Sequence, residues 1–551
     1  MIKRDGKIFM KDKNQNNSFI MQAGILAFAG ILCRIIGILY RSPLTKIIGD
    51  EGNGYYSTAY NIYAIILLVS SYSIPSAISK VISQRLALKE YKNAHRIFKC
   101  ALLYVVIVGG IASLFTFFFA GVLVEEHSVS VLRIFAPTIF FSGLLGVLRG
   151  YFQSHRTMVQ TSISQILEQL ANAAISIFAA HMLMQTVKNT TKTNQAIYGA
   201  MGSAMGTGTG VLIALIFMIS VYCLNRRMMK NRIERDTSTS LLSYKSIFKI
   251  IIFMVTPVIL STFIYNFSTS LNQTIYSKIM KNQYGMEISK IASQYGIFSG
   301  KAVVITNIPI AIASAISAAM LPNVTGTYAR GDIKSTNDLV NRATHFTMLL
   351  SIPSAVGLFV LARPVVQLLF PQPGSIRTAT ELLQGLCITV IFYSLSTLTN
   401  AVLQAIGKVN MPAINSAIAL VVQTIVLFGL LKFTSLRLFS LVIVAIVYSL
   451  LMCILNQISI SRALGYQNQI MKSFVMPSII ALLMGIVTYI VYHISYYLIK
   501  SNVISMVIAI IVAVIFYAFG IIKGRVVRED ELLDMPKGAM LVRMAKKLRL
   551  L

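Results

Sequence analysis

Apolar runs of about 20 residues recur along the whole chain and are separated by charged or Pro/Gly/Asn-rich stretches. A helix rises about 1.5 Å per residue, so each run is long enough to cross a bilayer. The pattern predicts an all-α polytopic membrane protein with about 14 transmembrane helices. They are expected near residues 18–40, 55–80, 97–123, 131–150, 158–184, 196–223, 247–273, 292–320, 345–362, 378–403, 411–431, 438–460, 474–498 and 503–522.

The basic residues are divided unevenly between the two sides of this pattern. With the N-terminus inside, the inner segments hold 33 Lys and Arg and the outer ones 12, while Arg34, Lys80, Arg133 and Lys301 lie in or at the edges of spans. Inner segments of membrane proteins carry such an excess, which predicts that both termini are cytoplasmic. The apolar run that follows the basic N-terminal tail is too long for a cleavable signal peptide.

Composition narrows the class of protein further. Apolar residues make up 56% of the 551 residues and charged residues only 12%, which excludes a soluble enzyme. The net charge of +31 is explained by the inner basic segments, so no nucleic-acid partner is required. The five cysteines and six histidines show neither metal-ligand nor disulfide spacing, and we predict no cofactor.

A long basic connection at 225–245 leaves six spans before it and eight after. The two parts are related: SAIS at 76–79 recurs at 314–317, and the stretch 139–158 resembles 391–411. Repeats of this kind are typical of secondary transporters with alternating access. We predict two pseudosymmetric six-helix lobes around a central cavity, plus two C-terminal helices. The expected parts are a cytoplasmic tail (1–17), an N-lobe (18–223), a cytoplasmic linker (224–246), a C-lobe (247–460), helices thirteen and fourteen (461–522) and a basic cytoplasmic tail (523–551).

Three stretches carry a family resemblance: CRIIGILYRSPLTKIIGDEGNGYYSTAYNIY (33–63), IPSAISKVISQRLA (74–87) and GYFQSHRTMVQTSISQILEQ (150–169). They resemble the stage V sporulation protein B branch of polysaccharide exporters, which includes MurJ-type lipid II flippases. The larger superfamily also holds MATE drug antiporters. The resemblance covers roughly residues 18–522. It implies a V-shaped cavity between the lobes, a lipid groove beside the two extra helices, and a saccharide on undecaprenyl pyrophosphate as substrate.

The same resemblance implies basic residues in the cavity. Arg34 stands where the family's first arginine is expected, Arg41 lies one residue beyond the second position, and Lys301 is near the family's basic residue of span eight. The arginine expected late in span two has no counterpart in LLVSSYS (67–73). We therefore expect a basic cavity without the family's full set of arginines.

Physical chemistry points to the same residues. A charge at mid-membrane costs several kcal/mol unless it has a partner or faces water. Arg34 and Arg41 are two helical turns apart and so share a face, and a guanidinium suits phosphate oxygens. We predict substrate binding by Arg34, Arg41 and Lys301. For Arg41 and Lys301 the alternative is a side chain that reaches the head groups at the outer membrane edge.

Glu168 is the one carboxylate deep in a predicted span, and Gln165 and Asn172 share its helix face. It is a candidate proton or cation site, or a counter-charge to an arginine, and we favour the counter-charge. Pro75, Pro257 and Pro309 are candidate hinges, although static kinks are equally common.

Two further segments have distinctive patterns. The glycines of GSAMGTGTG (202–210) lack a following Lys-Ser/Thr and predict close helix packing rather than a phosphate loop. The C-terminal stripe of Leu541, Met544, Leu548 and Leu551, with basic residues beside it, predicts either a helix on the inner leaflet or a solvated tail.

Together these features predict a flippase of the bacterial plasma membrane. It is expected to move a lipid-linked anionic saccharide, lipid II above all, from the inner to the outer leaflet, coupled to membrane potential, Na⁺ or H⁺. Membrane lipids and the cell-wall synthesis machinery are the expected partners. The alternatives are a MATE-like antiporter of cationic drugs, an exporter of another lipid-linked polysaccharide, an integral glycosyltransferase and a sporulation-specific scaffold.

Overall fold

The computed structural model describes residues 5–72, 74–155, 157–234, 236, 241–466, 469–527 and 543. Inside its helices, the described side chains leave out those of 5–24, 26–28, 31, 71–72, 76–77, 251, 253–262, 264–265, 318–319 and 322. The stripe predicted at Leu541, Met544, Leu548 and Leu551 therefore lies outside the described residues. By contact density the chain divides into a first unit, Met1–Gly296, and a second unit, Ile297–Leu551. The two predicted lobes were defined by pseudosymmetry, and their boundaries differ from those of these contact units. The division into lobes stays a prediction.

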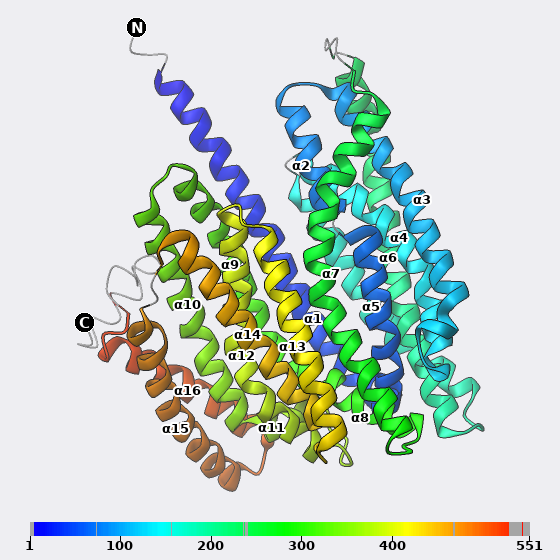
Figure 1. Cartoon of the computed structure of the whole chain (residues 1–551), viewed down its shortest axis with the longest axis vertical. Coiled ribbons are helices and arrows are strands. Elements are labelled where there is room, and N and C mark those ends of the chain that lie inside the picture. The colour runs from blue at the N-terminus through cyan, green and yellow to red at the C-terminus, as the bar shows by residue number, and fades with distance from the viewer. Residues whose placement is uncertain are drawn as a thin grey trace. The chain divides into compact units, whose positions relative to one another are not determined.

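The described part of the first unit consists of helices joined by short turns and connections (Figure 1). Its helices are α1 (Asp5–Leu67), a π-helical segment (Leu68–Tyr72), α2 (Ile74–Ala87), α3 (Tyr91–Leu123), α4 (Glu126–Ser154), α5 (Met158–Thr186), α6 (Lys192–Glu234), α7 (Tyr244–Asn282) and α8 (Ile288–Ile297).

Helix α1 departs from the predicted connection between spans one and two. The polar stretch 41–54 was expected to be a connection, but it is helical and broken only at Gly49, where φ is 71° and ψ is 179°. A glycine adopts this positive φ without the steric cost of a Cβ atom, so one residue suffices to redirect the helix. Across the break the side-chain amide of Asn53 donates to the hydroxyl of Thr45 at 2.9 Å.

Eleven helices in the described part of the chain are long and apolar enough to cross a membrane. They coincide with predicted spans three to six and eight to fourteen, which confirms a polytopic all-α membrane protein. The other three predicted spans fall on α1, on the end of α1 with α2, and on α7, where many side chains lie outside the described set.

Helices α5 and α6 lie in close contact along a seam of glycines. A Cβ atom built on Gly202 would lie 2.3 Å from the backbone nitrogen of Ala180, and one on Gly206 would lie 2.4 Å from that of Ser176. At Gly210 the carbonyl oxygen of Glu168 would be 2.7 Å away. These distances confirm the prediction that the glycine-rich segment serves helix packing.

Helices α7 and α8 are tied to the second half of α1. The side-chain amide of Asn61 donates to the Oε1 atom of Gln273 at 2.7 Å and to the hydroxyl of Tyr295 at 3.0 Å. A Cβ atom on Gly54 would lie 1.9 Å from the carbonyl oxygen of Ala292, so the two backbones meet directly. The start of α8 therefore belongs to the packing of the first unit.

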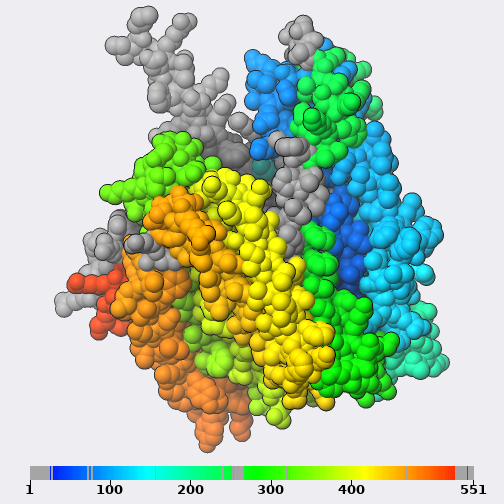
Figure 2. Space-filling view, viewed as in Figure 1, coloured from blue at the N-terminus to red at the C-terminus, as the bar shows by residue number. Residues whose placement is uncertain are grey.

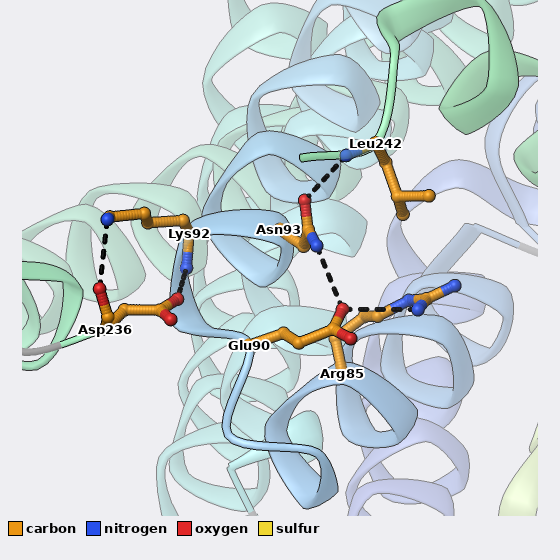
Figure 3. Close-up of polar contacts among 6 residues, drawn as sticks. All are labelled: Arg85, Glu90, Lys92, Asn93, Asp236 and Leu242. Atoms are coloured by element: carbon orange, nitrogen blue, oxygen red, sulfur yellow. Dashed lines mark hydrogen bonds and ion pairs between the residues drawn. The ribbon is translucent and has the colours of Figure 1, made fainter. Parts of the chain in front are cut away.

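The linker between α6 and α7 is fastened to the first turn of α3 (Figure 3). The carboxylate of Asp236 accepts the backbone N–H of Lys92 at 2.6 Å, and the backbone N–H of Leu242 donates to the side-chain oxygen of Asn93 at 3.0 Å. The amide of Asn93 in turn donates to the carboxylate of Glu90 at 2.9 Å. Asp236 thus satisfies an N–H that the helix itself leaves unpaired.

The second unit contains the remaining helices and two further π-helical segments, Phe298–Ala302 and Met471–Val475. The first of these segments joins α8 to α9. The helices of the second unit are α9 (Val303–Ala329), α10 (Ile333–Val360), α11 (Ala362–Leu369), α12 (Ile376–Ala405), α13 (Asn410–Phe433), α14 (Phe439–Leu464), α15 (Met476–Ile499) and α16 (Asn502–Lys523).

Within the second unit, α15 and α16 lie side by side, and α15 packs on α10 (Figure 1). Met348 and Ile352 of α10 share a core with Ala481 and Met484 of α15 and Tyr517 of α16. These are the two extra C-terminal helices of the predicted fold.

Helix α13 shows how this unit meets a membrane. In the space-filling view it forms the yellow surface turned to the viewer (Figure 2). Between Met411 and Phe428 its exposed side chains recur at three and four residues and are all apolar. They are Met411, Ile414, Ile418, Val421, Ile425 and Phe428. A continuous exposed stripe of this kind is suited to lipid tails rather than to water.

Candidate functional site

The site is built where the first half of α1 lies along α5. Tyr40, Leu44 and Ile48 of α1 share a buried core with Ala180 of α5. About one turn before Tyr40, a Cβ atom on Gly37 would lie 3.1 Å from the Nε2 atom of Gln169. Residues further along α1 contact residues further along α5, so the two helices run parallel, as expected for spans one and five.

A chain of polar side chains crosses from α1 through α5 to α6. The amide of Asn172 donates to the hydroxyl of Tyr40 at 3.4 Å, and its oxygen accepts from the hydroxyls of Ser176 at 2.9 Å and Thr207 at 3.4 Å. The hydroxyls of Thr207 and Tyr56 are 3.2 Å apart. Asn172, predicted to share the face of Glu168, is therefore the centre of a hydrogen-bond network that joins three helices.

Glu168 forms an ion pair with Arg149 of α4. The Nη2 atom of Arg149 lies 2.7 Å from the Oε2 atom of Glu168, and its Nε atom donates to the hydroxyl of Ser164 at 2.8 Å. The two charged side chains are 15% and 30% exposed, so the pair is at the edge of the packed helices rather than inside them. Glu168 thus has an arginine partner; its predicted role as a counter-charge or an ion site stays a prediction.

The predicted arginines of α1 directly follow Cys33 and Tyr40, two residues that lie near this pair and the polar network. The thiol of Cys33 is within electrostatic range of both Arg149 and Glu168, and the next residue, Arg34, is exposed. Arg41 lies near the hydroxyls of Tyr40 and Tyr56, because the break at Gly49 turns the second half of α1 back toward the first.

This part of the first unit is a basic face, defined by Arg34, Arg41, Arg149 and Glu168. Three cations and one carboxylate leave it with a formal charge of +2. Charged groups within spans are stable only where they face water, a polar cavity or each other. In the basic face, Arg149 and Glu168 face each other, Arg41 faces tyrosine hydroxyls, and Arg34 is exposed. Gln165, half-buried on α5, lies one turn before Glu168.

Lys301 has a different environment, in the second unit. It lies in the π-helical segment Phe298–Ala302, and its side chain has 0% exposure. The ammonium donates to the hydroxyl of Ser375 at 2.5 Å and to the side-chain oxygen of Gln372, both in the turn between α11 and α12. In this conformation the Lys301 side chain is enclosed by protein, and it lies neither in an open cavity nor at the membrane edge. Substrate contact by Lys301 stays a prediction that requires this enclosure to open.

The candidate hinge prolines occupy three kinds of position. Pro75 is the second residue of α2, where a missing N–H costs nothing. Its carbonyl oxygen packs closely against Gly150, where an added Cβ atom would lie 2.6 Å from it. Pro309 is buried inside α9. Pro257 falls within α7, but its side chain lies outside the described residues. Their hinge roles stay predictions.

Arg149 is the site residue that the sequence-based prediction missed. It was placed at the inner edge of span four and counted with the inner connection. A signal was present: α4 and α5 form an antiparallel pair joined by a turn near 156, which places position 149 opposite about position 164. Glu168 is one turn beyond Ser164 on the same face. A deep carboxylate and an arginine at this register predict an ion pair.

Comparison with known families identifies the chain. A family model described as "Polysaccharide biosynthesis protein" matches residues 20–326, more than half of the sequence. The chain belongs to this family. A second model, MatE, matches residues 300–428, so both branches of the predicted superfamily are represented.

Individual relatives agree with this assignment. The lipid II flippase MurJ of Bacillus subtilis (strain 168) is 23% identical, over 84% of this chain and 86% of the relative. Stage V sporulation protein B of the same organism is 22% identical, over 86% and 89%. A solved structure titled "Lipid II flippase MurJ, inward closed conformation" matches with a TM-score of 0.65 at 14% identity, over 90% of this chain and 98% of that one.

These matches confirm the predicted resemblance to the polysaccharide exporter branch. The protein is a multi-pass membrane transporter of the superfamily that unites polysaccharide exporters, lipid flippases and MATE antiporters, and not an enzyme.

Proposed function

We propose that this transporter moves a saccharide linked to undecaprenyl pyrophosphate, and specifically lipid II, from the inner to the outer leaflet of the bacterial plasma membrane. The observation that carries the proposal is the basic face of the first unit. Its arginines present planar forks of N–H donors, which match the oxygens of a pyrophosphate. The similarity to the lipid II flippase MurJ along most of both chains supports the same substrate class.

The charge of this face argues against a cationic substrate. A MATE-like antiporter of cationic drugs needs carboxylates at the substrate site, whereas here Glu168 is already paired with Arg149. The surrounding Arg34 and Arg41 would repel a cation and attract an anion. An anionic lipid head group is the better complement.

The proposal includes a driving force. With both termini in the cytoplasm, an anionic head group leaves a negative interior and moves down the electrical gradient. Each charge is worth about 2.3 kcal/mol per 100 mV, so roughly two phosphate charges at about 150 mV supply some 7 kcal/mol. Sodium or proton coupling through Glu168 is the alternative.

Complementation tests the substrate. In a bacterium depleted of its own lipid II flippase, expression of this chain is expected to restore growth and cell-wall synthesis. Arg34→Ala should abolish the rescue, whereas Arg377→Ala should not, because Arg377 is an exposed residue that pairs with Glu381 of the same helix. A chain that inserts correctly but fails to restore growth would point to a different lipid-linked saccharide.

A further inference from the structure

Arg149 and Glu168 meet through a single contact. Only one oxygen of Glu168 is engaged, by one terminal nitrogen of Arg149. Among the residues that the structure describes, neither the Nη1 atom of Arg149 nor the Oε1 atom of Glu168 has a hydrogen-bond partner. An arginine that served only to pair with a carboxylate would gain more from the two-point contact that its fork allows.

Arg149 is held in place without Glu168. Its Nε atom donates to the hydroxyl of Ser164, whose own hydrogen is donated to the carbonyl of Thr161 at 2.7 Å. The hydroxyl is thereby oriented to accept from the guanidinium. If the carboxylate leaves, this bond still fixes the arginine, and both terminal nitrogens become available to an oxyanion.

The carboxylate can leave by side-chain rotation alone. The backbone of Glu168 is packed tightly against α6. Its carbonyl oxygen is so close to Gly210 that a Cβ atom added to this glycine would lie 2.7 Å from it. The side chain, however, is 30% exposed, so there is room for it to rotate away from Arg149.

We infer that Arg149 is a phosphate ligand of the transporter and that Glu168 is its internal competitor, which occupies the place of one substrate phosphate when no substrate is bound. The ligand class is a diphosphate carried on a lipid. The pyrophosphate displaces the carboxylate on binding, and the carboxylate returns to Arg149 as the head group leaves. The competitor keeps binding weak enough for release. This inference rests on the proposed function.

Binding of farnesyl diphosphate to the purified full-length chain tests the exchange. Glu168→Gln keeps the size of the side chain but removes the charge, and it is expected to tighten binding by about ten- to a hundredfold, the ratio that corresponds to one charged hydrogen bond. Arg149→Gln in the Glu168→Gln background should remove the gain. Glu381→Gln is the matched control, since it removes one carboxylate paired with an arginine elsewhere and should leave binding unchanged.

A melting curve for each variant separates ligand exchange from a structural ion pair. If Glu168→Gln melts as the parent protein does but binds farnesyl diphosphate no more tightly, the inference is overturned. If Glu168→Gln is less stable than the parent protein, a second variant decides. Glu168→Asp keeps the charge but is one methylene shorter, and the inference is also overturned if neither variant binds farnesyl diphosphate more tightly. Equal gains for inorganic pyrophosphate and farnesyl diphosphate would overturn the lipid part. Absence of prenyl diphosphate binding in the parent and in every variant would instead refute the proposed function.

Discussion

The glycine seam between α5 and α6 gives a direct prediction for the substitution Gly206→Ala. The added Cβ atom would lie 2.0 Å from the hydroxyl oxygen, 2.4 Å from the backbone nitrogen and 2.6 Å from the Cα atom of Ser176. Ordinary van der Waals contact begins near 3.4 Å, so α5 has to move away from α6 by about 1 Å. A rotamer change of Ser176 removes only the first of these clashes, because the other two atoms are backbone or Cα.

Overpacking of a tight core costs about 1–3 kcal/mol, and contact with backbone places this case at the upper end. A loss of about 3 kcal/mol changes the unfolding equilibrium roughly a hundredfold. The same displacement disturbs Ser176, whose hydroxyl donates to Asn172 in the polar network, so transport should fall as well.

Equilibrium unfolding in mixed micelles measures the effect. Gly121→Ala in α3 is the control, since no atom lies within 4 Å of its added Cβ atom. An alanine in a helix interior is otherwise favoured over glycine by about 0.5–1 kcal/mol, so this control should be neutral or slightly more stable. Equal stability of the two variants would refute the packing argument.

Three further predictions concern the buried Lys301, the contact of Asp236 with α3, and the membrane topology. Lys301→Met removes the hydrogen bonds that the ammonium donates to Gln372 and Ser375 and should lower stability by about 1–3 kcal/mol; an unchanged melting temperature would contradict the enclosed position of the ammonium. Asp236→Ala should cost about 0.5–2 kcal/mol and speed hydrogen exchange in the first turn of α3, while Asp236→Asn, which keeps an acceptor, should cost less. For topology, single cysteines should be labelled from inside at Asn231 and from outside at Asn189, and labelling of Asn231 from outside would overturn the fourteen-span map.

The spans could be predicted from sequence because hydropathy alone determines which segments can lie in lipid. The connection between spans one and two could not. Its glycines, charges and Pro43 are typical of a loop, yet Leu44 and Ile48 bury against α5 and keep the segment helical up to Gly49. Tertiary packing overrode local preference here.

The candidate site was predictable to different degrees. Charges inside apolar runs made Arg34 and Glu168 candidates directly, and their roles stay predictions. The environment of Lys301 was not accessible, because its partners Gln372 and Ser375 lie about 70 residues away and no local pattern links them. Arg149 was within reach of a register argument, since its partner lies in the next helix of a hairpin.

The central claim is that this transporter carries a lipid-linked pyrophosphate outward through its basic face. The most direct measurement reconstitutes the chain in vesicles with fluorescent lipid II and follows the accessibility of its head group under a potassium-diffusion potential. We predict outward movement that slows when the potential is collapsed or reversed and is lost in Arg34→Ala. Movement that ignores the potential but follows a sodium or proton gradient would contradict the electrical driving force. Lipid II that stays in its original leaflet with the parent protein would contradict the central claim itself.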